Sequence, residues 1–472
     1  MGYDLLIRNG QVVDPTSTLP PQVIDVAIEA GKICALARPG QLQEDGTRLI
    51  DANGLYLFPG MIDPHVHINT RVAGSMRGGF KLTSLAAIHG GTTTFCDFTT
   101  PMQGHEFLQV IERQRLEADG ATFCDFCLHA GIPPMGAEDI SQIGEAIAKG
   151  FPSFKAFMLN SRGRPGIEDG LLFAVMSACA RNGGLLGVHA ENGQLISYFS
   201  QRLLQEGKGG MRYYASSRPN ICEAEAVQRA IALTRVARSA IYFYHVSSAE
   251  GTEAIREARQ EGLPVYGETC PHYLLFTDEV YGGENGFLFN RVPPIRSQRD
   301  QDALWQALVD GTLSCIGTDD VATTLALKRQ PPAGPDFTDF PGGMPQIETR
   351  LALLHSEGVV KGRISLSQLV YLLSTGPARV FGLYPQKGAI AVGSDADLVL
   401  FDPNIEKIIT AKQLHCGSDT TVYEGWKVKG WPVMTVLRGQ VIIDRGMLVD
   451  STPQGQCCLR RIDPAILRGP KG

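Results

Sequence analysis

The sequence predicts an α/β fold, a (β/α)8 barrel of the TIM type joined to a composite β-sandwich domain that both ends of the chain form together. Short strand patterns fill residues 3–58 and return near the C-terminus, whereas strand and helix patterns alternate over roughly 60–385. Such a long alternation is typical of a barrel rather than of a doubly wound sheet. The expected parts are the composite β domain at 1–58 and 386–450, the barrel at 59–385 and a C-terminal arm at 451–472.

Composition places the chain among large globular proteins. Of its 472 residues, 43% are hydrophobic and 19% are charged, which excludes disordered, collagen-like and coiled-coil proteins. The net charge of −6 without a run of like charges makes nucleic acid and an anionic membrane unexpected partners. Neither a secretory leader nor a membrane-spanning apolar run is visible. Eleven scattered cysteines indicate reduced thiols, and we expect a cytoplasmic protein.

The strands expected at the two chain ends are all short and are joined by tight turns. The run 4–8 leads into Asn9-Gly10, a pair that favours a hairpin turn, and a second strand would then begin at Gln11. The pair Arg438-Gly439 predicts a similar turn near the other end. The remaining strands of this kind are expected at 23–29, 32–37, 397–402, 433–437 and 440–444.

The expected barrel elements have buried strands and amphipathic helices. The run 91–98 reads as a buried strand. Ser297 can cap a helix whose apolar positions share one face, and Gly311 would end that helix. Further helices are expected at 223–237 and 365–374.

Five side chains suited to metal binding fall at predicted strand ends. His65 and His67 are two residues apart, so in a strand both imidazoles face the same side and could meet one metal. His189, His245 and Asp319 each follow a short apolar strand. Because barrel active sites are built at that end of the strands, these side chains are expected to meet.

Lys155 stands inside an apolar strand, in the run 153–158. Burial of a charged amine is costly unless the charge is paired. Two interpretations remain open. The side chain could reach water from the strand end, or CO₂ could convert its amine into a carbamate, an anion able to bridge two metals.

Several features together carry a resemblance to a known family. They are the composite β ends, the Lys155 strand, the two later histidine strands and the runs 59–67, 90–93 and 317–319. With them the chain resembles the amidohydrolase superfamily and, within it, the cyclic amidohydrolases hydantoinase, dihydropyrimidinase and allantoinase. The resemblance extends to about residue 450. Further runs that match the hydantoinase and dihydropyrimidinase pattern are 97–104, 125–132, 189–192, 267–274 and 393–398.

The resemblance implies a binuclear zinc hydrolase that opens the ring of a cyclic amide or ureide of the hydantoin or dihydropyrimidine type. His65, His67 and Asp319 would hold one zinc, and His189 and His245 the other. Carbamylated Lys155 and a hydroxide would bridge the two ions of each subunit, and that hydroxide would attack the scissile carbonyl. Asp319 would act as general base and then as general acid. The resemblance also implies a homotetramer and a small-molecule substrate.

The expected substrate contacts depart from the family pattern. Asn160 stands where the family usually has a Tyr that stabilises the oxyanion, and losing such a donor costs roughly 10²–10³ in rate. Val292 replaces a Ser before Pro-Pro, and Gly342 replaces the Asn of an Asn-Gly turn. At these two sites the family contacts the ring through main-chain atoms. Asp320 replaces a His that typically follows the metal-binding Asp.

These departures leave two alternatives open. An allantoinase-like or atypical cyclic-imide hydrolase is the first. A non-catalytic scaffold like the collapsin-response-mediator relatives of dihydropyrimidinase is the second, and the retention of all six ligand residues argues against it. Metal analysis would separate a scaffold from an enzyme.

The remaining histidines are expected outside the ligand set. His129 and His272 lie in family motifs near strand ends, where packing or support of a ligand is expected. Surface or loop positions are expected for His89, His105, His355 and His415.

Overall fold

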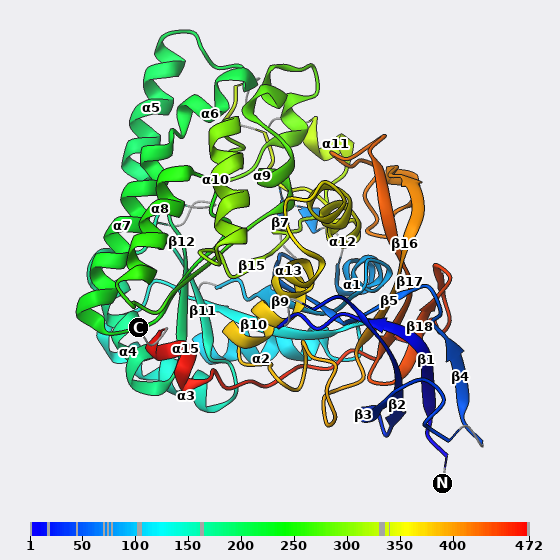
Figure 1. Ribbon diagram of the computed structural model, residues 1–472. Helices are drawn as coiled ribbons and strands as arrows, with labels where there is room; N and C mark the ends of the chain where they lie inside the picture. The colour runs from blue at the N-terminus through cyan, green and yellow to red at the C-terminus, as the bar shows by residue number, and fades with distance from the viewer. Residues whose placement is uncertain are drawn as a thin grey trace.

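The computed structural model describes residues 2–16, 19–43, 46–68, 71–72, 75–76, 79–101, 106–160, 165–329, 336–338 and 340–469 (Figure 1). The middle of the chain forms a barrel surrounded by helices, and the two ends of the chain meet in a separate sheet beside it. The predicted fold class is confirmed. The limits of the domains, 1–58 with 386–450 and 59–385, remain a prediction.

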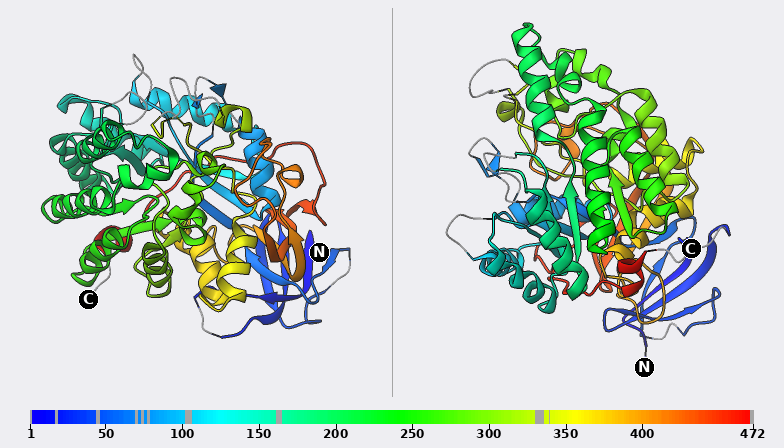
Figure 2. Two further views of the ribbon diagram at one scale, coloured as in Figure 1. Left: turned by 90° about the horizontal axis from the view of Figure 1, so that it is seen from above. Right: turned by 90° about the vertical axis from the view of Figure 1, so that its left-hand side faces the viewer.

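Eight parallel strands form the barrel in the described ranges, each paired with the next along the chain. The first and last of these strands come together where Val66 forms a parallel bridge with Asp320 and the amide of His67 donates to the carbonyl of Asp320 at 2.9 Å. The strands lie inside a layer of helices in the view from above (Figure 2). They are β6 (Met61–Val66), β9 (Thr92–Phe98), β10 (Asp125–Gly131), β11 (Ser153–Phe157), β12 (Leu185–His189), β13 (Ile241–Phe243), β14 (Val265–Thr269) and β15 (Cys315–Ile316).

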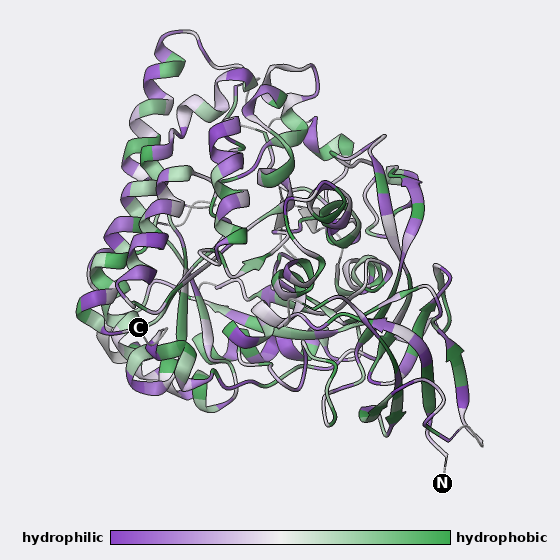
Figure 3. Ribbon diagram, viewed as in Figure 1, coloured by the Kyte–Doolittle hydropathy of each residue, from purple (hydrophilic) through white to green (hydrophobic). Residues whose placement is uncertain are grey.

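The helices cover the outside of the barrel, and their outer faces carry the polar residues while the strands are largely hydrophobic (Figure 3). The helix predicted after Ser297 is confirmed, with the carboxylate of Asp300 accepting from the Ser297 amide at 3.2 Å. The α-helices in the described residues are α1 (Gly79–His89), α2 (Phe107–Ala118), α3 (Ser141–Ala148), α4 (Asp169–Asn182), α5 (Gly193–Gln205), α6 (Tyr214–Ser217), α7 (Asn220–Ala237), α8 (Ala249–Gln260), α9 (Pro271–Leu275), α10 (Gln298–Val309), α11 (Leu325–Lys328), α12 (Arg350–Leu354), α13 (Leu366–Val370), α14 (Gly376–Val380) and α15 (Pro464–Arg468).

A nine-stranded sheet joins the two chain ends in the described residues. Strand β5 lies between β1 from the N-terminal side and β16 from the C-terminal side, so neither end completes the sheet alone (Figure 1). Its strands are β1 (Leu5–Val12), β2 (Gln22–Glu29), β3 (Lys32–Ala37), β4 (Arg48–Asp51), β5 (Tyr56–Pro59), β16 (Leu398–Ile408), β17 (Lys427–Leu437), β18 (Gln440–Asp444) and β19 (Met447–Leu448). A small separate pair is β7 (Arg71–Val72) with β8 (Ser75–Met76).

The hairpin predicted at Asn9-Gly10 is wrong, because β1 continues through the pair as one strand. Asn9 adopts a left-handed backbone (φ 59°) at a register shift in the pairing with β2. Its amide donates to Asp25 at 2.8 Å and its side chain donates to Asp51 at 3.0 Å. An Asn tolerates this backbone, so the pair forms a bulge here rather than a turn.

The C-terminal arm crosses the base of the barrel as far as the described residues reach, at Gly469 (Figure 1). The amide of Phe126 donates to Gln456 at 3.0 Å, and the amide of Cys458 donates back to Phe126 at 2.8 Å. Arg460 donates to the carbonyl of Leu128 at 2.7 Å. Within the described ranges, no helix has the length and apolar character needed to cross a membrane.

Candidate metal centre

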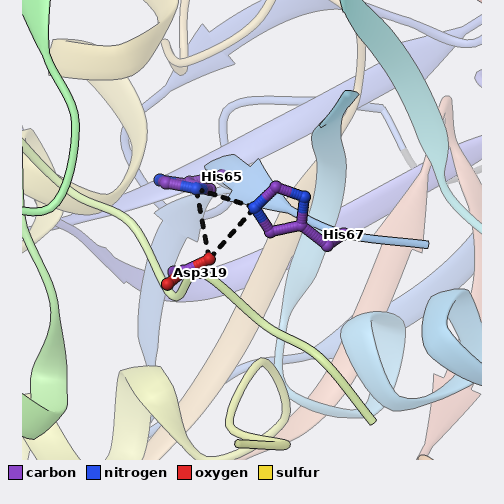
Figure 4. A group of neighbouring side chains, drawn as sticks. All are labelled: His65, His67 and Asp319. Carbon is purple, nitrogen blue, oxygen red and sulfur yellow. Dashed lines mark hydrogen bonds and ion pairs between the residues drawn. The ribbon is translucent and has the colours of Figure 1, made fainter. Parts of the chain in front are cut away.

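Three of the predicted ligands meet at the end of β6 (Figure 4). The Nε2 atoms of His65 and His67 lie 3.2 Å apart, and Oδ1 of Asp319 lies 3.2 Å from the first and 3.1 Å from the second. In the described residues this is the one group of three or more ligand-type side chains whose donor atoms all lie within 4.8 Å of one another. Two imidazole nitrogens and one carboxylate oxygen converging on a point suit a divalent metal.

A carboxylate that sequence reasoning missed holds the first histidine in place. Glu268, fully buried on β14, contacts Nδ1 of His65 and accepts from the Tyr242 hydroxyl at 2.9 Å. His65 thereby turns its Nε2 toward His67 and Asp319. A carboxylate behind a ligating histidine fixes the ring and raises its basicity. The only available signal was an acid within the buried strand run 265–269.

The other two histidines lie beside this group. The ring centroids of His65 and His245 are 5.3 Å apart, and those of His245 and His189 are 4.5 Å apart. Glu191 binds Nε2 of His189 at 2.7 Å and Arg218 binds the same carboxylate oxygen at 2.8 Å. This arrangement fixes the His189 ring and leaves Nδ1 as its nitrogen for a metal.

Two of the site residues stand on unusual backbone. His245 and Asp319, each just beyond a strand end, have φ values of 41° and 52°. Non-glycine residues seldom adopt this left-handed region, and such strain is concentrated at functional sites. The chain turns sharply at both positions and thereby brings the two side chains over the barrel mouth.

The amine of Lys155 is buried on β11 and has no hydrogen-bond partner within the described ranges. It lies 3.7 Å from the ring centroid of Tyr244. Burial lowers the pKa of Lys155 to about 7, although Asp319 and Glu268 act in the opposite direction. A large share of the amine is therefore neutral near pH 7, the form that reacts with CO₂.

The pKa values of the second histidine pair favour neutral rings. Burial lowers the pKa of His189, and burial with the neighbouring charges of His189 and Lys155 holds the pKa of His245 well below its usual range. Nδ1 of His245 is buried without a partner in the described part of the chain. Neutral imidazoles are the form that binds metal, so the residues fit a metal group.

Asp319 is fixed on its other side by a second residue that sequence reasoning missed. Nη2 of Arg291 lies 2.6 Å from Oδ2 of Asp319 and also contacts the main-chain carbonyl oxygen of Asp319. Burial opposes ionisation, but the Arg291 guanidinium and His65 hold the pKa of Asp319 well below its usual range. Asp319 is therefore a carboxylate at neutral pH, as a metal ligand must be.

The predicted substrate contacts lie on loops. Asn160 is exposed, and its Oδ1 accepts from the amide of Gly166 at 3.0 Å. The segments around Val292 and Gly342 run side by side, because a Cβ on Gly342 would lie 3.6 Å from the carbonyl oxygen of Asn290.

Asp320 supports a loop of the barrel mouth. Its Oδ1 accepts from the amides of Gln346 and Ile347 at 2.5 and 2.9 Å. A histidine could not accept two such bonds with one ring nitrogen. Asp320 therefore holds the segment that follows the Gly342 loop against the end of β15.

The other histidines correct part of the sequence analysis. Both ring nitrogens of His129 are engaged, by Ser153 at 2.7 Å and by the Pro64 carbonyl at 3.0 Å, so His129 packs behind the site as expected. His89 and His355 are buried, not at the surface as predicted. His89 stacks on His415 at 3.6 Å, and His355 binds the Lys429 carbonyl at 2.7 Å. His272 contacts Gln346, and His105 lies outside the described residues.

Comparisons with known proteins agree with this geometry. The model of the amidohydrolase family matches residues 56–442. A D-hydantoinase of Geobacillus stearothermophilus is 39% identical over 96% of this chain and 95% of its own. The structure of a dihydropyrimidinase from Brevibacillus agri is 36% identical over 97% of this chain and 98% of its own, with a TM-score of 0.92. The structure of an L-hydantoinase from Arthrobacter aurescens is 31% identical over 97% of this chain and 100% of its own, with a TM-score of 0.90.

Proposed function

Since this chain belongs to the amidohydrolase family and is a metal-dependent hydrolase of cyclic amides, we propose that it opens the ring of a hydantoin or a dihydropyrimidine. The observation that carries the proposal is the convergence of His65, His67 and Asp319 at the mouth of the barrel. The relatives named for hydantoin and dihydropyrimidine rings cover nearly the whole chain.

The proposed metal group is a pair of zinc ions in each subunit. His65, His67 and Asp319 would hold one ion, and His189 and His245 the other. Carbamylated Lys155 would lie between them, which the buried and unpartnered amine supports. The carbamate would place a negative charge where the described residues leave a neutral amine.

The metal pair, when bound, supplies a water of lowered pKa and polarises the scissile carbonyl. Asp319 would accept the proton of that water at a carboxylate oxygen and pass it to the leaving ring nitrogen. Glu268 keeps His65 oriented throughout, and Glu191 does the same for His189. No other described residue is needed to hold a proton in this scheme.

The ring itself would lie between loops. We propose that main-chain atoms at Val292 and Gly342 contact the ring, and that Asn160 contributes a weaker contact through its amide. The departure from Tyr at position 160 favours an allantoinase-like or cyclic-imide substrate as the second candidate. The product of a hydantoin would be an N-carbamoyl amino acid.

We also propose that the protein is a homotetramer and that it is located in a reducing compartment such as the cytoplasm. All eleven cysteines, each within the described ranges, are free thiols, which is typical of a reducing environment. Light scattering coupled to size exclusion would test the assembly, and a mass of one or two chains would contradict it.

The function is tested by turnover of the zinc- and bicarbonate-loaded protein on a panel of rings. The panel holds hydantoin, 5-substituted hydantoins, dihydrouracil, allantoin, dihydroorotate and simple cyclic imides. Turnover of hydantoins or dihydrouracil is the expected result. Turnover of allantoin or of imides alone would favour the second candidate, and no turnover by fully metal-loaded protein would contradict both.

A further inference from the structure

Arg291 is a buried cation at the barrel mouth to which the proposed mechanism gives no task. Its side chain is 3% exposed, and it stands directly before Val292, whose main chain is a proposed ring contact. Its guanidinium reaches Asp319 by two contacts through one nitrogen, Nη2. A charged group buried this deeply requires a partner or a function.

The two oxygens of the Asp319 carboxylate face different neighbours. Oδ1 lies 3.1–3.2 Å from the Nε2 atoms of His67 and His65, and Oδ2 lies 2.6 Å from Arg291. The guanidinium therefore stands one carboxylate away from the two histidines. A group in this position is within reach of a ring whose leaving nitrogen receives a proton from Asp319.

The guanidinium retains an unused donor. Arg has five N–H donors, and Nε of Arg291 is buried without a hydrogen-bond partner among the described residues. Asp320, the other carboxylate whose charge acts on Arg291, accepts from the amides of Gln346 and Ile347 through Oδ1. Its Oδ2 is buried without a partner among the described residues, so it does not accept from Nε of Arg291. A buried donor without an acceptor is costly, so an oxygen of a bound substrate would complete it.

The site otherwise has a weak donor where a strong one is needed. Asn160, at the position of the oxyanion-binding Tyr, is exposed, and the donor that its side chain offers is a neutral amide, Nδ2. Its amide arm is also shorter than a phenol. Beside the metal pair, the negative charge that develops on the carbonyl oxygen would therefore lack a strong side-chain donor at this position.

We propose that Arg291 contacts the reacting carbonyl oxygen and stabilises the charge that develops on it, a catalytic role that rests on the proposed function. A water that has lost one proton to solvent adds through its oxygen to the carbonyl carbon, the C–N bond breaks, and the second proton of that water, carried by Asp319, goes to the ring nitrogen. The carbonyl oxygen and the water oxygen become the two oxygens of the product carboxylate. Arg291 therefore also binds that carboxylate, with the planar geometry that suits a guanidinium.

The test measures product affinity beside turnover. N-carbamoylglycine, the ring-opened product of hydantoin, is titrated calorimetrically into zinc-loaded wild type, Arg291→Met and Arg291→Lys. Arg291→Met is expected to lower kcat roughly 10²–10³-fold and to lower product affinity at least about tenfold. Because Arg291 also holds Asp319, zinc affinity should fall somewhat, but at saturating zinc the zinc content should be unchanged. Arg291→Lys keeps a point charge without the planar fork and should recover part of both losses.

The matched control is Arg460→Met, which removes a buried guanidinium beneath the barrel, where Arg460 binds the Leu128 carbonyl. Product affinity should be unchanged in this variant. Millimolar guanidinium should restore part of the turnover of Arg291→Ala, because the small cation can fill the vacated place.

Four outcomes would overturn the inference. Unchanged product affinity with lowered turnover means that Arg291 acts only by positioning Asp319, and a fall in zinc content means that it serves the metal site. Unchanged turnover in Arg291→Met removes the role altogether. A metal-loaded wild type that opens no ring of the panel contradicts the proposed function, and the inference with it. If Arg291→Met does not fold, the same comparison is made with Arg291→Lys.

Discussion

The two sides of the active centre are built from different parts of the fold. The metal side stands on or directly after barrel strands, with His65 on β6 and Lys155 on β11. The substrate side stands on loops, with Asn160 beyond β11 and Val292 and Gly342 on the connections around α10 and β15. The ends of barrel strands are held in fixed positions by the sheet, whereas the loops can vary in sequence without changing the barrel.

The metal side and the substrate side should tolerate different kinds of substitution. By the family resemblance, all six proposed metal ligands match the family residue type, while the three proposed substrate contacts and Asp320 do not. Under the proposed function, the strand-end side carries the hydrolytic chemistry and the loop side carries the choice of ring. Substitutions on the metal side should therefore abolish activity, and substitutions on the substrate side should change which rings are opened and how fast.

The largest effect is expected from Lys155→Ala. Without the amine no carbamate can form, so zinc content should fall below two per subunit, and turnover should fall on the order of 10³-fold or more, since metal stabilisation is worth several kcal/mol. Metal analysis and turnover of the best ring measure both. Lys149→Ala, an exposed lysine beside the same strand, is the control. Wild-type zinc binding and turnover in Lys155→Ala would refute the bridging role.

Glu268→Gln should have the next largest effect. The amide can no longer hold His65 with a charge, and loss of such a supporting carboxylate costs 10–100-fold in metal affinity or activity, by a rough general estimate. Zinc affinity is measured by competition with a chelator. Tyr242→Phe removes only the hydroxyl that donates to the same carboxylate and should cost less. Equal effects of the two variants would show that Glu268 does not act through His65.

Gly317→Ala tests the close packing of the metal side. A Cβ at Gly317 would lie 2.6 Å from Oε2 of Glu268 and 2.9 Å from Cβ of His65. Overpacking of this kind costs about 1–3 kcal/mol, so the melting temperature and the zinc affinity should both fall. Gly170→Ala, in α4 with no atom near its added Cβ, should leave both unchanged or slightly raise stability. A Gly317→Ala variant as stable as wild type would mean that the strand ends move freely.

The smallest effect is expected from Asn160→Ala. Because Asn160 is exposed and its amide is shorter than a phenol, we expect the side chain to contribute little to the oxyanion, and kcat should fall less than about tenfold, well below the roughly 10²–10³ of a full oxyanion donor. Steady-state kinetics on the best ring measures the change. A fall of about 10³-fold would show that Asn160, rather than Arg291, stabilises the oxyanion.

The sequence located the group of His65, His67 and Asp319 for a physical reason. His65 and His67 follow the two-residue period of a strand, and His189, His245 and Asp319 follow short apolar runs that predict strands. The full set of six ligands remains a prediction. Glu268 and Arg291 were missed because neither has a spacing that marks its role. An acid in a buried run and an arginine in a loop acquire their task from distant segments of the chain.

Local signals failed where distant partners decide the outcome. Asn9-Gly10 forms a bulge because Asp25 and Asp51 bind Asn9. His355 is buried because a carbonyl of β17 accepts from its ring nitrogen. Neither partner is near in sequence, so no short pattern could reveal them.

The central claim is that two zinc ions and a carbamylated Lys155 open a cyclic amide. It is tested most directly by titrating zinc into metal-free protein with bicarbonate present, while bound zinc and ring opening are followed in the same samples. We predict two zinc ions per subunit, with turnover rising as the second ion binds. Full turnover with one ion, or with none, would contradict the account.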